Sequence, residues 1–480
     1  MTLRRSNHRL LALVTLTFLT LVSPLQAWGV TGGTDALGPT LDLTEIIGQV
    51  TDTDQEADDE PRAFLLTMGQ GDEVWEKFGH NAIWIHDPER GTDWVYNYGV
   101  FDFNSPGYWN RFVRGNWIYQ LAVFDIYTTL LEYQYRDRTV IAQELNLSRE
   151  EFEELREFLE WNAQPENAEY LYDYYRDNCS TRVRDLIDMV TGGALYEATG
   201  ETPSGTTYRW HSYRLVDGDL PVHTGLAIGL GPSADRPITV WEEMFLPGAL
   251  MERVREIEIP GPDGEPVPLV RGEQILYEAR GRAAEAAEPS SLILHYLIAG
   301  LLIGGAFLAV GGHLGYHESA ERVEDDEYRG PTILTRLAQV GLVILGVGWA
   351  LSSGAAGILL TGLWAFTNHS IAHRNLNLFQ LDPLAIVLVV TIPALLFGAQ
   401  WARRPSELLT RVIAAGSVFG ALLQLTPWFS QGNGEIIALA VPANLGLAGA
   451  VYLLRRYRYG PRADTGVDSP GYQRSVPASR

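Results

Sequence analysis

The chain has 480 residues, 46% of them hydrophobic, and a formal net charge of −23. This length exceeds one ordinary domain, so we expect two or three folded units. The negative charge is concentrated between residues 28 and 290, where 48 acidic residues stand against 20 basic ones. Such a surface repels phosphate groups, which excludes nucleic acids as partners. The single cysteine also excludes a disulfide bond within the chain.

The N-terminus has the pattern of a signal peptide. Three arginines precede an apolar run over residues 10–22, and SPLQA then leads to Ala27. Residues 1–27 are therefore predicted to be a signal peptide or an N-terminal anchor, and either one exports the domain after it. Residues 28–60, rich in Gly, Thr and acidic side chains, are predicted to be an acidic flexible leader.

A β-hairpin is predicted near the start of the exported catalytic domain, which we expect to span residues 61–258. The run RAFLLTMG predicts a first strand at 62–69, and the residues from His80 to His86 alternate with period two. After the turn PERG, the run DWVYNYGVFDF returns as a second strand. If residue i pairs with residue 179 − i, Asn97 lies on the His80 face, one diagonal step away. A slip of one residue would reverse that face.

A further strand and an amphipathic helix come next in the chain. The run RTVIAQELNL at 138–147 predicts the strand, and Ser148 with Glu151 forms a capping box that begins the helix. The apolar residues of this helix recur at helical spacing and predict its buried stripe. They are Phe152, Leu155 and Leu159.

Cys179 lies in the run YDYYRDNCSTRVRDLIDMV, where Asp177 and Asn178 are good N-cap residues. The apolar residues after it recur at helical spacing, so Cys179 is predicted to lie in the first turn of a helix that ends at Gly192. A thiol at a helix N-terminus can have its pKa lowered from about 8.5 to roughly 3.5–7.5, which makes a nucleophilic thiolate. The alternative interpretation is a small buried apolar residue.

The remainder of the domain is expected to be irregular. Residues 201–258 are predicted to be a mixture of short strands and turns. Residues 259–290 are predicted to be a juxtamembrane linker and helix, with the helix at 271–289 leading to the membrane.

Residues 291–455 contain long apolar segments, which predict an all-α transmembrane domain of five spans. Two groups of arginines then lie in the cytoplasm, in accord with the positive-inside rule: Arg403 with Arg404, and Arg455, Arg456 and Arg458 at the 456–480 tail. The loops 367–382 and 426–434 lie outside, beside the exported domain. The predicted spans are 292–312, 336–366, 383–401, 408–425 and 434–454.

A cysteine nucleophile requires a base, and histidine has the suitable pKa. Of the histidines in the domain, only His80 and His86 lie on a clear amphipathic strand. Histidine on a strand, a polar residue on the next strand and Cys179 at a helix start make a papain-like arrangement in permuted order. The third role stays open between Asn97 and His86, because it depends on the hairpin register.

A set of motifs is similar to the Lnb family of bacterial lipoprotein N-acyltransferases. The motifs are FLLTMGQGDEVWEKFGHNAIWI, VYNYGVFDF, DNCSTRVRDL, TYR, LGPSADRPIT and MFLP. FGH and DNCSTR, 99 residues apart, are the specific pair, and the resemblance runs from Phe64 to the end of the last span. The acidic leader and the single lysine depart from the family without touching these motifs.

The resemblance implies an α+β, papain-like exported domain, circularly permuted as in NlpC-type and LRAT-like enzymes, followed by five membrane helices. It implies that His80 is the base and Cys179 the nucleophile. The implied reaction moves an acyl chain through a Cys thioester to the N-terminal cysteine amine of a bacterial lipoprotein. The donor stays open between a membrane phospholipid and the lipoprotein's own diacylglyceryl group. The implied location is the bacterial inner membrane, with the catalytic domain on the periplasmic side.

Two other functions remain as alternatives. The first is a membrane-tethered thiol hydrolase acting on peptidoglycan peptides or phospholipid. The second is a non-catalytic membrane binding module that anchors a partner. We expect no cofactor, and the sequence leaves the oligomeric state open.

Four further residues are candidates for binding substrate. Arg182 could contact a lipid phosphate, although an ion-paired helix face is the favoured interpretation for Arg182 and Arg184. His369, Asn375 and Asn377 lie in the outer loop, where they could bind a headgroup or peptide, or simply be solvated at the interface. His369 and His373 have a metal-like spacing but no third ligand nearby, so no metal is expected.

Overall fold

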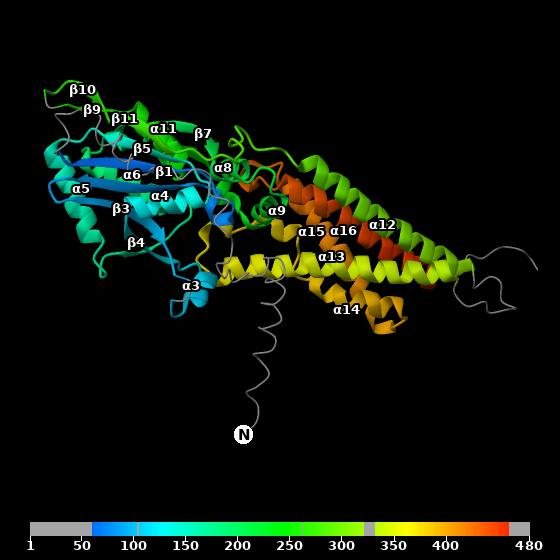
Figure 1. Cartoon of the computed structure of the whole chain (residues 1–480). Coiled ribbons are helices and arrows are strands. Elements are labelled where there is room, and N and C mark those ends of the chain that lie inside the picture. Colours follow the sequence, from blue (N-terminus) through cyan, green and yellow to red (C-terminus); the bar gives the residue numbers. More distant parts are fainter. Residues whose placement is uncertain (1–59, 103–104, 262, 321–331, 460–480) are drawn as a thin grey trace, which may run out of the picture. The chain divides into compact units, whose positions relative to one another are not determined.

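The computed structural model describes residues 60–102, 105–261, 263–320 and 332–459 (Figure 1). Every described residue belongs to one compact unit. The predicted signal peptide, the leader up to residue 59 and the tail from residue 460 lie outside the described residues. Residues 60–290 are called the N-terminal domain and residues 291–459 the helical part.

The N-terminal domain is built on one antiparallel sheet of seven strands in the order β11-β5-β1-β2-β3-β4-β6. A short turn joins the second and third strands in the chain, whereas the strands at the two edges of the sheet pair with partners far away in sequence. The strands are β1 (Arg62–Met68), β2 (His80–Asp87), β3 (Thr92–Val100), β4 (Ile118–Asp125), β5 (Val140–Leu145), β6 (Glu169–Leu171) and β11 (Val270–Tyr277).

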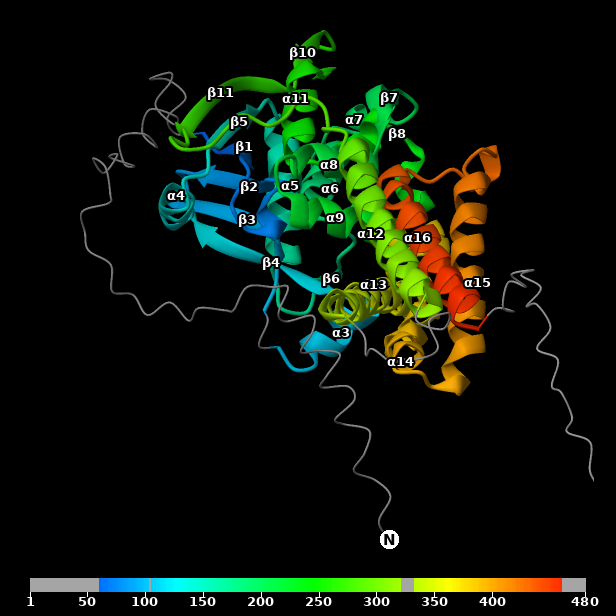
Figure 2. The same cartoon turned by 90° about the vertical axis from the view of Figure 1, so that its right-hand side faces the viewer.

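Helices cover both faces of this sheet. Helix α4 (Ile126–Tyr135) lies on one face, while α5 (Arg149–Asn162) and α6 (Cys179–Val190) lie on the other (Figures 1 and 2). All seven residues of the central strand β1 are therefore buried. Leu65 packs into the core under α5 and α6, and the Phe64 ring on the opposite face stacks on Trp84 at 4.4 Å.

The predicted hairpin and its register are confirmed. Strand β2 pairs with β3 so that Ile83 faces Tyr96 and His86 faces Asp93, which is the 179 − i register. The side chains therefore keep the faces that the alternation predicts, and Asn97 lies on the His80 face.

The two long helices of the domain begin where their capping residues predict. Ser148 and Glu151 form a capping box at α5. Asn178 caps α6 by accepting a hydrogen bond from the backbone N–H of Thr181, which makes Cys179 the first residue of the helix. The predicted stripe of α5, Phe152, Leu155 and Leu159, is buried.

Two sequence-based expectations in the second half of the domain are wrong. Residues 201–258 are mainly short helices, three of which begin at side-chain caps supplied by Thr207, Asp219 and Thr239. Residues 270–277 are strand β11 instead of a helix, because β5 offers an open edge for pairing. The helices are α8 (Tyr208–Leu215), α9 (Leu220–Gly229), α10 (Val240–Glu243) and α11 (Pro247–Glu256), and α7 (Ala194–Thr199) precedes them.

Small elements complete the domain. Helix α3 (Tyr108–Arg114) precedes β4, and a two-stranded sheet joins β7 (Pro203–Thr207) to β8 (Pro237–Thr239). The hairpin of β9 (Glu258–Pro260) and β10 (Pro266–Pro268) leads into β11. The short 3-10 helices η1 (Val74–Glu76) and η2 (Pro232–Asp235) form turns.

The helical part contains four helices, among the described residues, that are long and apolar enough to cross a membrane. They are α12 (Ile293–Ala320), α13 (Ile333–Phe366), α15 (Arg403–Leu423) and α16 (Gly434–Tyr459). The third predicted span, 383–401, contains only α14 (Ala385–Leu396), followed by η5 (Gln400–Ala402). At 1.5 Å per residue α14 is about 18 Å long, shorter than a hydrocarbon core of about 30 Å.

Glycines allow the closest helix contacts in this part. A Cβ atom at Gly446 of α16 would lie 2.4 Å from the Cα atom of Gly304 of α12, so any side chain there would force the helices apart. Small residues at helix contacts are typical of membrane proteins. A buried polar network adds to this, since Asn444 donates hydrogen bonds to Gln380 O and Ser417 Oγ.

Candidate active site

Cys179 lies where the N-terminus of α6 meets the start of β2. Its Sγ atom accepts hydrogen bonds from the backbone N–H groups of Asn81, Ser180 and Cys179 itself. The surrounding protein atoms nevertheless raise the pKa of the thiol above its ordinary value, because burial costs a thiolate more than these donors return. The expected lowering of this pKa is therefore wrong, and the thiol is neutral at pH 7.

His80, the first residue of β2, is held by Asn97 of β3. The Nε2 atom of His80 donates to Oδ1 of Asn97 at 3.3 Å, and Nδ2 of Asn97 donates to Val95 O at 3.2 Å. Because the amide oxygen can only accept, the proton of the ring is on Nε2 and the lone pair is on Nδ1. Burial, followed by the charge of Arg138, lowers the pKa of His80 to about 4. The imidazole is therefore uncharged at physiological pH, and its Nδ1 atom can accept a proton.

Gly99 makes room for the thiol beside this pair. A Cβ atom at Gly99 would lie 3.5 Å from Cβ of Cys179, and its φ of +90° favours glycine. The ladder between β3 and β4 is irregular after Asn97. This bulge turns the end of β3 toward the N-terminus of α6, so that His80, Asn97 and Cys179 come to the same end of the sheet.

His86 lies at the other end of β2, about 20 Å away at 3.3 Å per residue. Its Nδ1 atom bonds Oδ1 of Asp93 at 2.7 Å, and its ring contacts Trp84. The hairpin register therefore favours Asn97 over His86 as the neighbour of His80.

Arg138 is a residue of this site that sequence analysis missed. It is buried, it donates from Nε to Gly69 O at 2.9 Å, and its Nη1 atom lies 3.5 Å from Oε1 of Glu76. Its charge lowers the pKa of both His80 and Cys179. The buried Nη2 atom has no hydrogen-bond partner among the described residues. The one signal for Arg138 in the sequence is its position just before the strand β5.

Three tyrosines from the segment before α6 surround the thiol. The charge of a Cys179 thiolate would raise the pKa of Tyr170, Tyr172 and Tyr174, in each case after the larger effect of burial. The Tyr170 hydroxyl lies 3.8 Å from the Cβ position of Gly99, is buried, and has no hydrogen-bond partner among the described residues. Tyr170 therefore brings a buried hydroxyl donor to the site.

Arg182 and Arg184 have partners within the domain. Arg182 forms a bidentate ion pair with Asp177 and lies over the Tyr170 ring at 4.3 Å. Arg184 is buried over Trp241 at 3.8 Å. The ion-paired interpretation is the one that this geometry supports.

The expectation that Asn375 and Asn377 bind substrate does not fit their surroundings. Both side chains are buried, and their amide groups donate to the last carbonyls of α9, at 2.8 Å to Ile228 O and 2.8 Å to Ala227 O. A helix C-terminus leaves such carbonyls unpaired. The two asparagines therefore attach the outer loop to the N-terminal domain, and their donors are not open to a ligand.

His369 and His373 also hold the outer loop. The His369 ring contacts Trp117 at 5.5 Å, and burial lowers its pKa while hydrogen bonds to the backbone near Val113 raise it. His373 bonds the carbonyl of Thr367 at 3.0 Å. Within the described ranges, no group of three or more His, Cys, Asp or Glu side chains is arranged to hold a metal ion.

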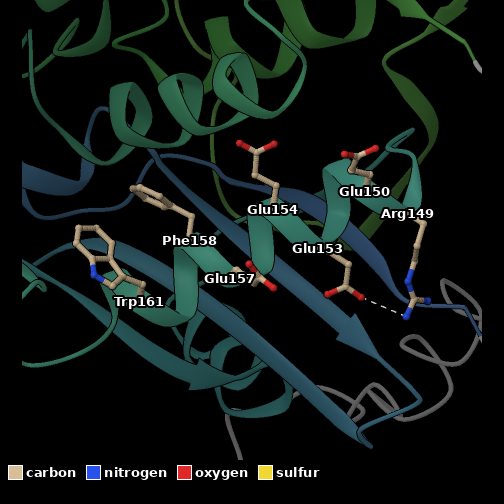
Figure 3. A pocket seen from close by; sticks show the side chains of 7 residues that line it. All are labelled: Arg149, Glu150, Glu153, Glu154, Glu157, Phe158 and Trp161. Carbon is tan, nitrogen blue, oxygen red and sulfur yellow. Dashed lines mark ion pairs between the residues drawn. The ribbon is translucent and has the colours of Figure 1, made fainter.

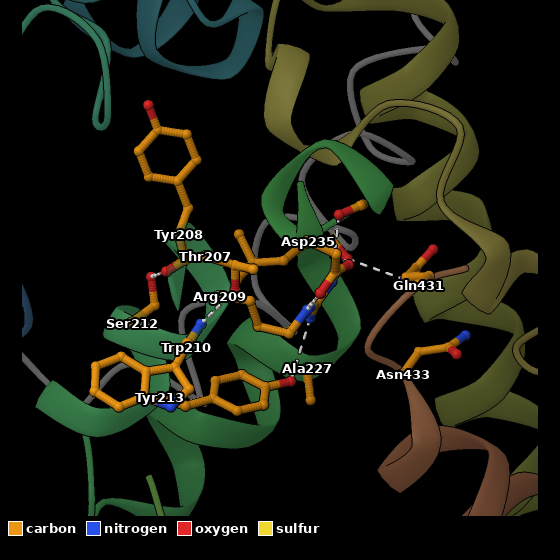
Figure 4. Close-up of polar contacts among 12 residues, drawn as sticks. Thr207, Tyr208, Arg209, Trp210, Ser212, Tyr213, Ala227, Asp235, Gln431 and Asn433 are labelled. Carbon is orange, nitrogen blue, oxygen red and sulfur yellow. Dashed lines mark hydrogen bonds and ion pairs between the residues drawn. The ribbon is translucent and has the colours of Figure 1, made fainter. Parts of the chain in front are cut away.

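A second outer loop packs on α8 and η2 (Figure 4). Arg209 forms an ion pair with Asp235 at 2.6 Å, and a Cβ atom at Gly432 would collide with both partners. Gln431 donates to Leu230 O at 3.1 Å. Together with the asparagines, these contacts fix the N-terminal domain on the helical part.

A hollow of about 860 Å³ lies along the outer face of α5 (Figure 3). Acidic side chains and the aromatic rings of Phe158 and Trp161 line it, and none of them contributes to the surroundings of Cys179. A solvated acidic helix face explains this hollow without a ligand.

Comparison with known proteins agrees with the site. Residues 52–216 match the family described as the Lnb N-terminal periplasmic domain. No curated protein and no solved structure matches the chain. The matched segment contains His80, Asn97 and Cys179, so the resemblance drawn from the motifs is confirmed over residues 52–216. The chain accordingly contains an N-terminal periplasmic domain of the Lnb type, which carries the candidate thiol site, and this domain is followed by helices that are long and apolar enough to cross a membrane.

Proposed function

We propose that this protein is a lipoprotein N-acyltransferase in which Cys179 is the nucleophile and His80 the base. The observation that carries the proposal is the hydrogen bond from His80 to Asn97 beside the only thiol of the chain. The chain order of base, orienting amide and nucleophile corresponds to a permuted papain-like arrangement. Acyl transfer needs these groups and no metal.

Two acyl transfers make up the reaction. In the first, Nδ1 of His80 takes the proton of the thiol while Sγ of Cys179 attacks an ester carbonyl. The C–S bond forms, the ester C–O bond breaks, and His80 protonates the departing alkoxide. In the second, an N-terminal amine attacks the thioester, the C–N bond forms, the C–S bond breaks, and the leaving thiolate recovers a proton through His80.

The tetrahedral intermediates carry an oxyanion that needs hydrogen-bond donors. The backbone N–H of Cys179, at the N-terminus of α6, is one donor. The hydroxyl of Tyr170 is the second, since it is buried beside Cys179 and its raised pKa keeps it protonated. The charge of Arg138 further favours a negative site.

The attachment to a helical part supports a membrane lipid as acyl donor. Moving a chain of about 14 methylenes from a bilayer into water costs on the order of 11 kcal/mol, at about 0.8 kcal/mol per CH₂. A thiol held at the bilayer surface avoids that cost. The partners that we propose are bacterial lipoproteins and a membrane phospholipid.

The helical part is proposed to cross the inner membrane five times, with the N-terminal domain in the periplasm. Both outer loops contact that domain, and Arg455 lies at the far end of the bundle, paired with Glu407. The segment of α14 and η5 connects the near end of α13 to the start of α15 at Arg403. It is the third crossing in this topology.

Mass spectrometry of lipoprotein N-termini tests the function. Cells with the intact protein should contain N-acylated lipoproteins, and cells with Cys179→Ser or His80→Ala should contain free amines while the variants still accumulate in the membrane. A hydrolase would leave free amines in every strain. Full N-acylation with Cys179→Ser would remove Cys179 as the nucleophile.

A further inference from the structure

Helix α3 exposes large apolar side chains. Trp109 and Val113 are each 63% exposed and Phe112 is 38% exposed, within a helix of seven residues. The helix also carries Arg111 and Arg114 and no acidic residue, although acids outnumber bases more than twofold between residues 28 and 290. Apolar rings with arginines are the composition of an element that binds a membrane interface.

Contacts to the outer end of α13 fix the position of helix α3 relative to the end of that long helix. The N–H of Asn368 donates to Arg114 O at 2.8 Å, and its side chain donates to Oδ1 of Asn116 at 2.7 Å. Gly115 packs so closely that a Cβ atom there would lie 2.9 Å from the backbone N of His369. Asn368 is only two residues beyond α13, a 34-residue apolar helix. Helix α3 is therefore held where a membrane span leaves the hydrocarbon.

The lipid-facing surface of α13 continues toward α3. Its last turn exposes Trp364 and, at 81%, Phe366. In a bilayer these rings are covered by lipid, and the same leaflet extends to the rings of α3 because the backbones are joined at Asn368. This continuity identifies lipid as the occupant that covers Trp109, Phe112 and Val113.

A row of aromatic rings leads from α3 to the thiol. The ring of Phe112 lies 5.9 Å from Trp109 and stacks on Trp117 at 5.3 Å. Trp117 stacks on Tyr172 at 6.1 Å, and Tyr172 lies close enough to Cys179 for the thiolate charge to act on its hydroxyl. An alkyl chain can follow such a surface without contact with water.

We infer that α3 is an interfacial helix inserted into the leaflet that faces the N-terminal domain, and that its aromatic row guides a lipid acyl chain to Cys179. The insertion is independent of catalysis. The guiding of the acyl chain rests on the proposed function, because it assigns a route to that acyl donor. A protein partner or a second copy on α3 would be a different occupant, and spin-label accessibility distinguishes both from lipid.

Spin-label accessibility tests the insertion. Cys179→Ala removes the only native thiol, so a single label can be placed at Trp109→Cys or Val113→Cys in the full chain, in nanodiscs of phosphatidylethanolamine and phosphatidylglycerol. Both labels should collide with oxygen more than with a water-soluble nickel chelate. Trp161→Cys on α5, with a native exposure of 55%, is the matched control and should show the reverse. Nickel accessibility at 109 and 113 equal to the control, or shielding from both reagents, would overturn the insertion.

Photo-crosslinking tests the aromatic row without any turnover. A phospholipid with a diazirine in its acyl chain, in the same nanodiscs with Cys179→Ala protein, should form adducts on Trp117 and Tyr172. Phe112→Ser should lower their yield several-fold, and Phe158→Ser on α5 should leave it unchanged. Absence of adducts on both residues would refute the row, whereas adducts together with full N-acylation in Cys179→Ser cells would count against the proposed function alone.

Discussion

The Nε2 atom of His80 lies 3.3 Å from Oδ1 of Asn97, and this contact determines which nitrogen of the ring is basic. The same amide is held by Val95 O, so its oxygen keeps facing the ring. Nδ1 is left free to accept the thiol proton. Because both the thiol and the imidazole are neutral at pH 7, the pair differs from a pre-formed thiolate–imidazolium pair.

The activity should persist to unusually low pH. The pKa of His80 is lowered to about 4, so the ring loses its basic form only as the pH falls through that value, and an ordinary histidine would do so near 6.5. We expect kcat/KM to be flat above pH 6 and to fall with a limb near pH 4, measured with the protein in nanodiscs. A fall of kcat/KM centred near pH 6.5 would contradict the buried neutral imidazole.

His80→Ala should reduce kcat by about 10²–10⁴-fold, and Asn97→Ala should reduce it by less, since Asn97 only orients the base.

Arg138→Gln should move the acid limb upward. The guanidinium charge lowers the pKa of His80, so its removal raises that pKa. The pH at which kcat/KM falls should therefore shift from about 4 toward 6.5. Arg136→Gln is the matched control, because Arg136 pairs with the same Glu76 at 2.7 Å but lies at the surface. Equal pH profiles for both variants would show that Arg138 acts only on stability.

Tyr170→Phe should reduce kcat without a loss of folding stability. The lost hydroxyl has no hydrogen-bond partner among the described residues, and loss of one oxyanion donor costs about 10²–10³-fold in kcat. Tyr175→Phe provides the opposite control, since its hydroxyl bonds Ser212 at 2.8 Å. That variant should keep its kcat and lose about 1 kcal/mol of stability in thermal unfolding. Unchanged turnover in Tyr170→Phe would leave the second oxyanion donor unassigned.

Asn377→Ala should loosen the attachment of the N-terminal domain. It leaves Ala227 O without its side-chain donor, whereas Ile228 O keeps the donor of Asn375, and the loss should cost about 1–3 kcal/mol for a buried group. Thermal unfolding and limited proteolysis should both detect this change. Asn146→Ala, which loses a solvent-exposed hydrogen bond to Pro268 O, should have a much smaller effect. A higher KM for lipid with unchanged stability would instead favour the substrate-binding role that sequence analysis expected.

Reporter fusions should determine whether α14 crosses the membrane. A fusion after residue 382 should be periplasmic, and a fusion after residue 404 or at the C-terminus should be cytoplasmic. A periplasmic reporter after residue 404 would mean that α14 and η5 enter and leave on the same side, as the short length of α14 allows.

Local signals in the sequence determined the elements of the site. Period-two alternation defines β2, the turn PERG joins it to β3, and Asn178 caps α6, so His80 and Cys179 could be assigned to a strand and to a helix start. These choices depend on residues within a few positions of each other. The resemblance of the motifs then pointed to Cys179 and, among several histidines, to His80.

Tertiary structure decided what each element packs against and how the site titrates. The charge of Arg138 acts on the thiol from just before β5, and Tyr170 lies near it on β6, and no local pattern reports an interaction across 41 or nine positions of sequence. The helix N-terminus alone predicts a lowered pKa for Cys179, but burial by the folded domain reverses the direction. Likewise, residues 270–277 became a strand because β5 has a free edge. Burial and long-range pairing depend on the whole fold, so these features could not be obtained from sequence alone.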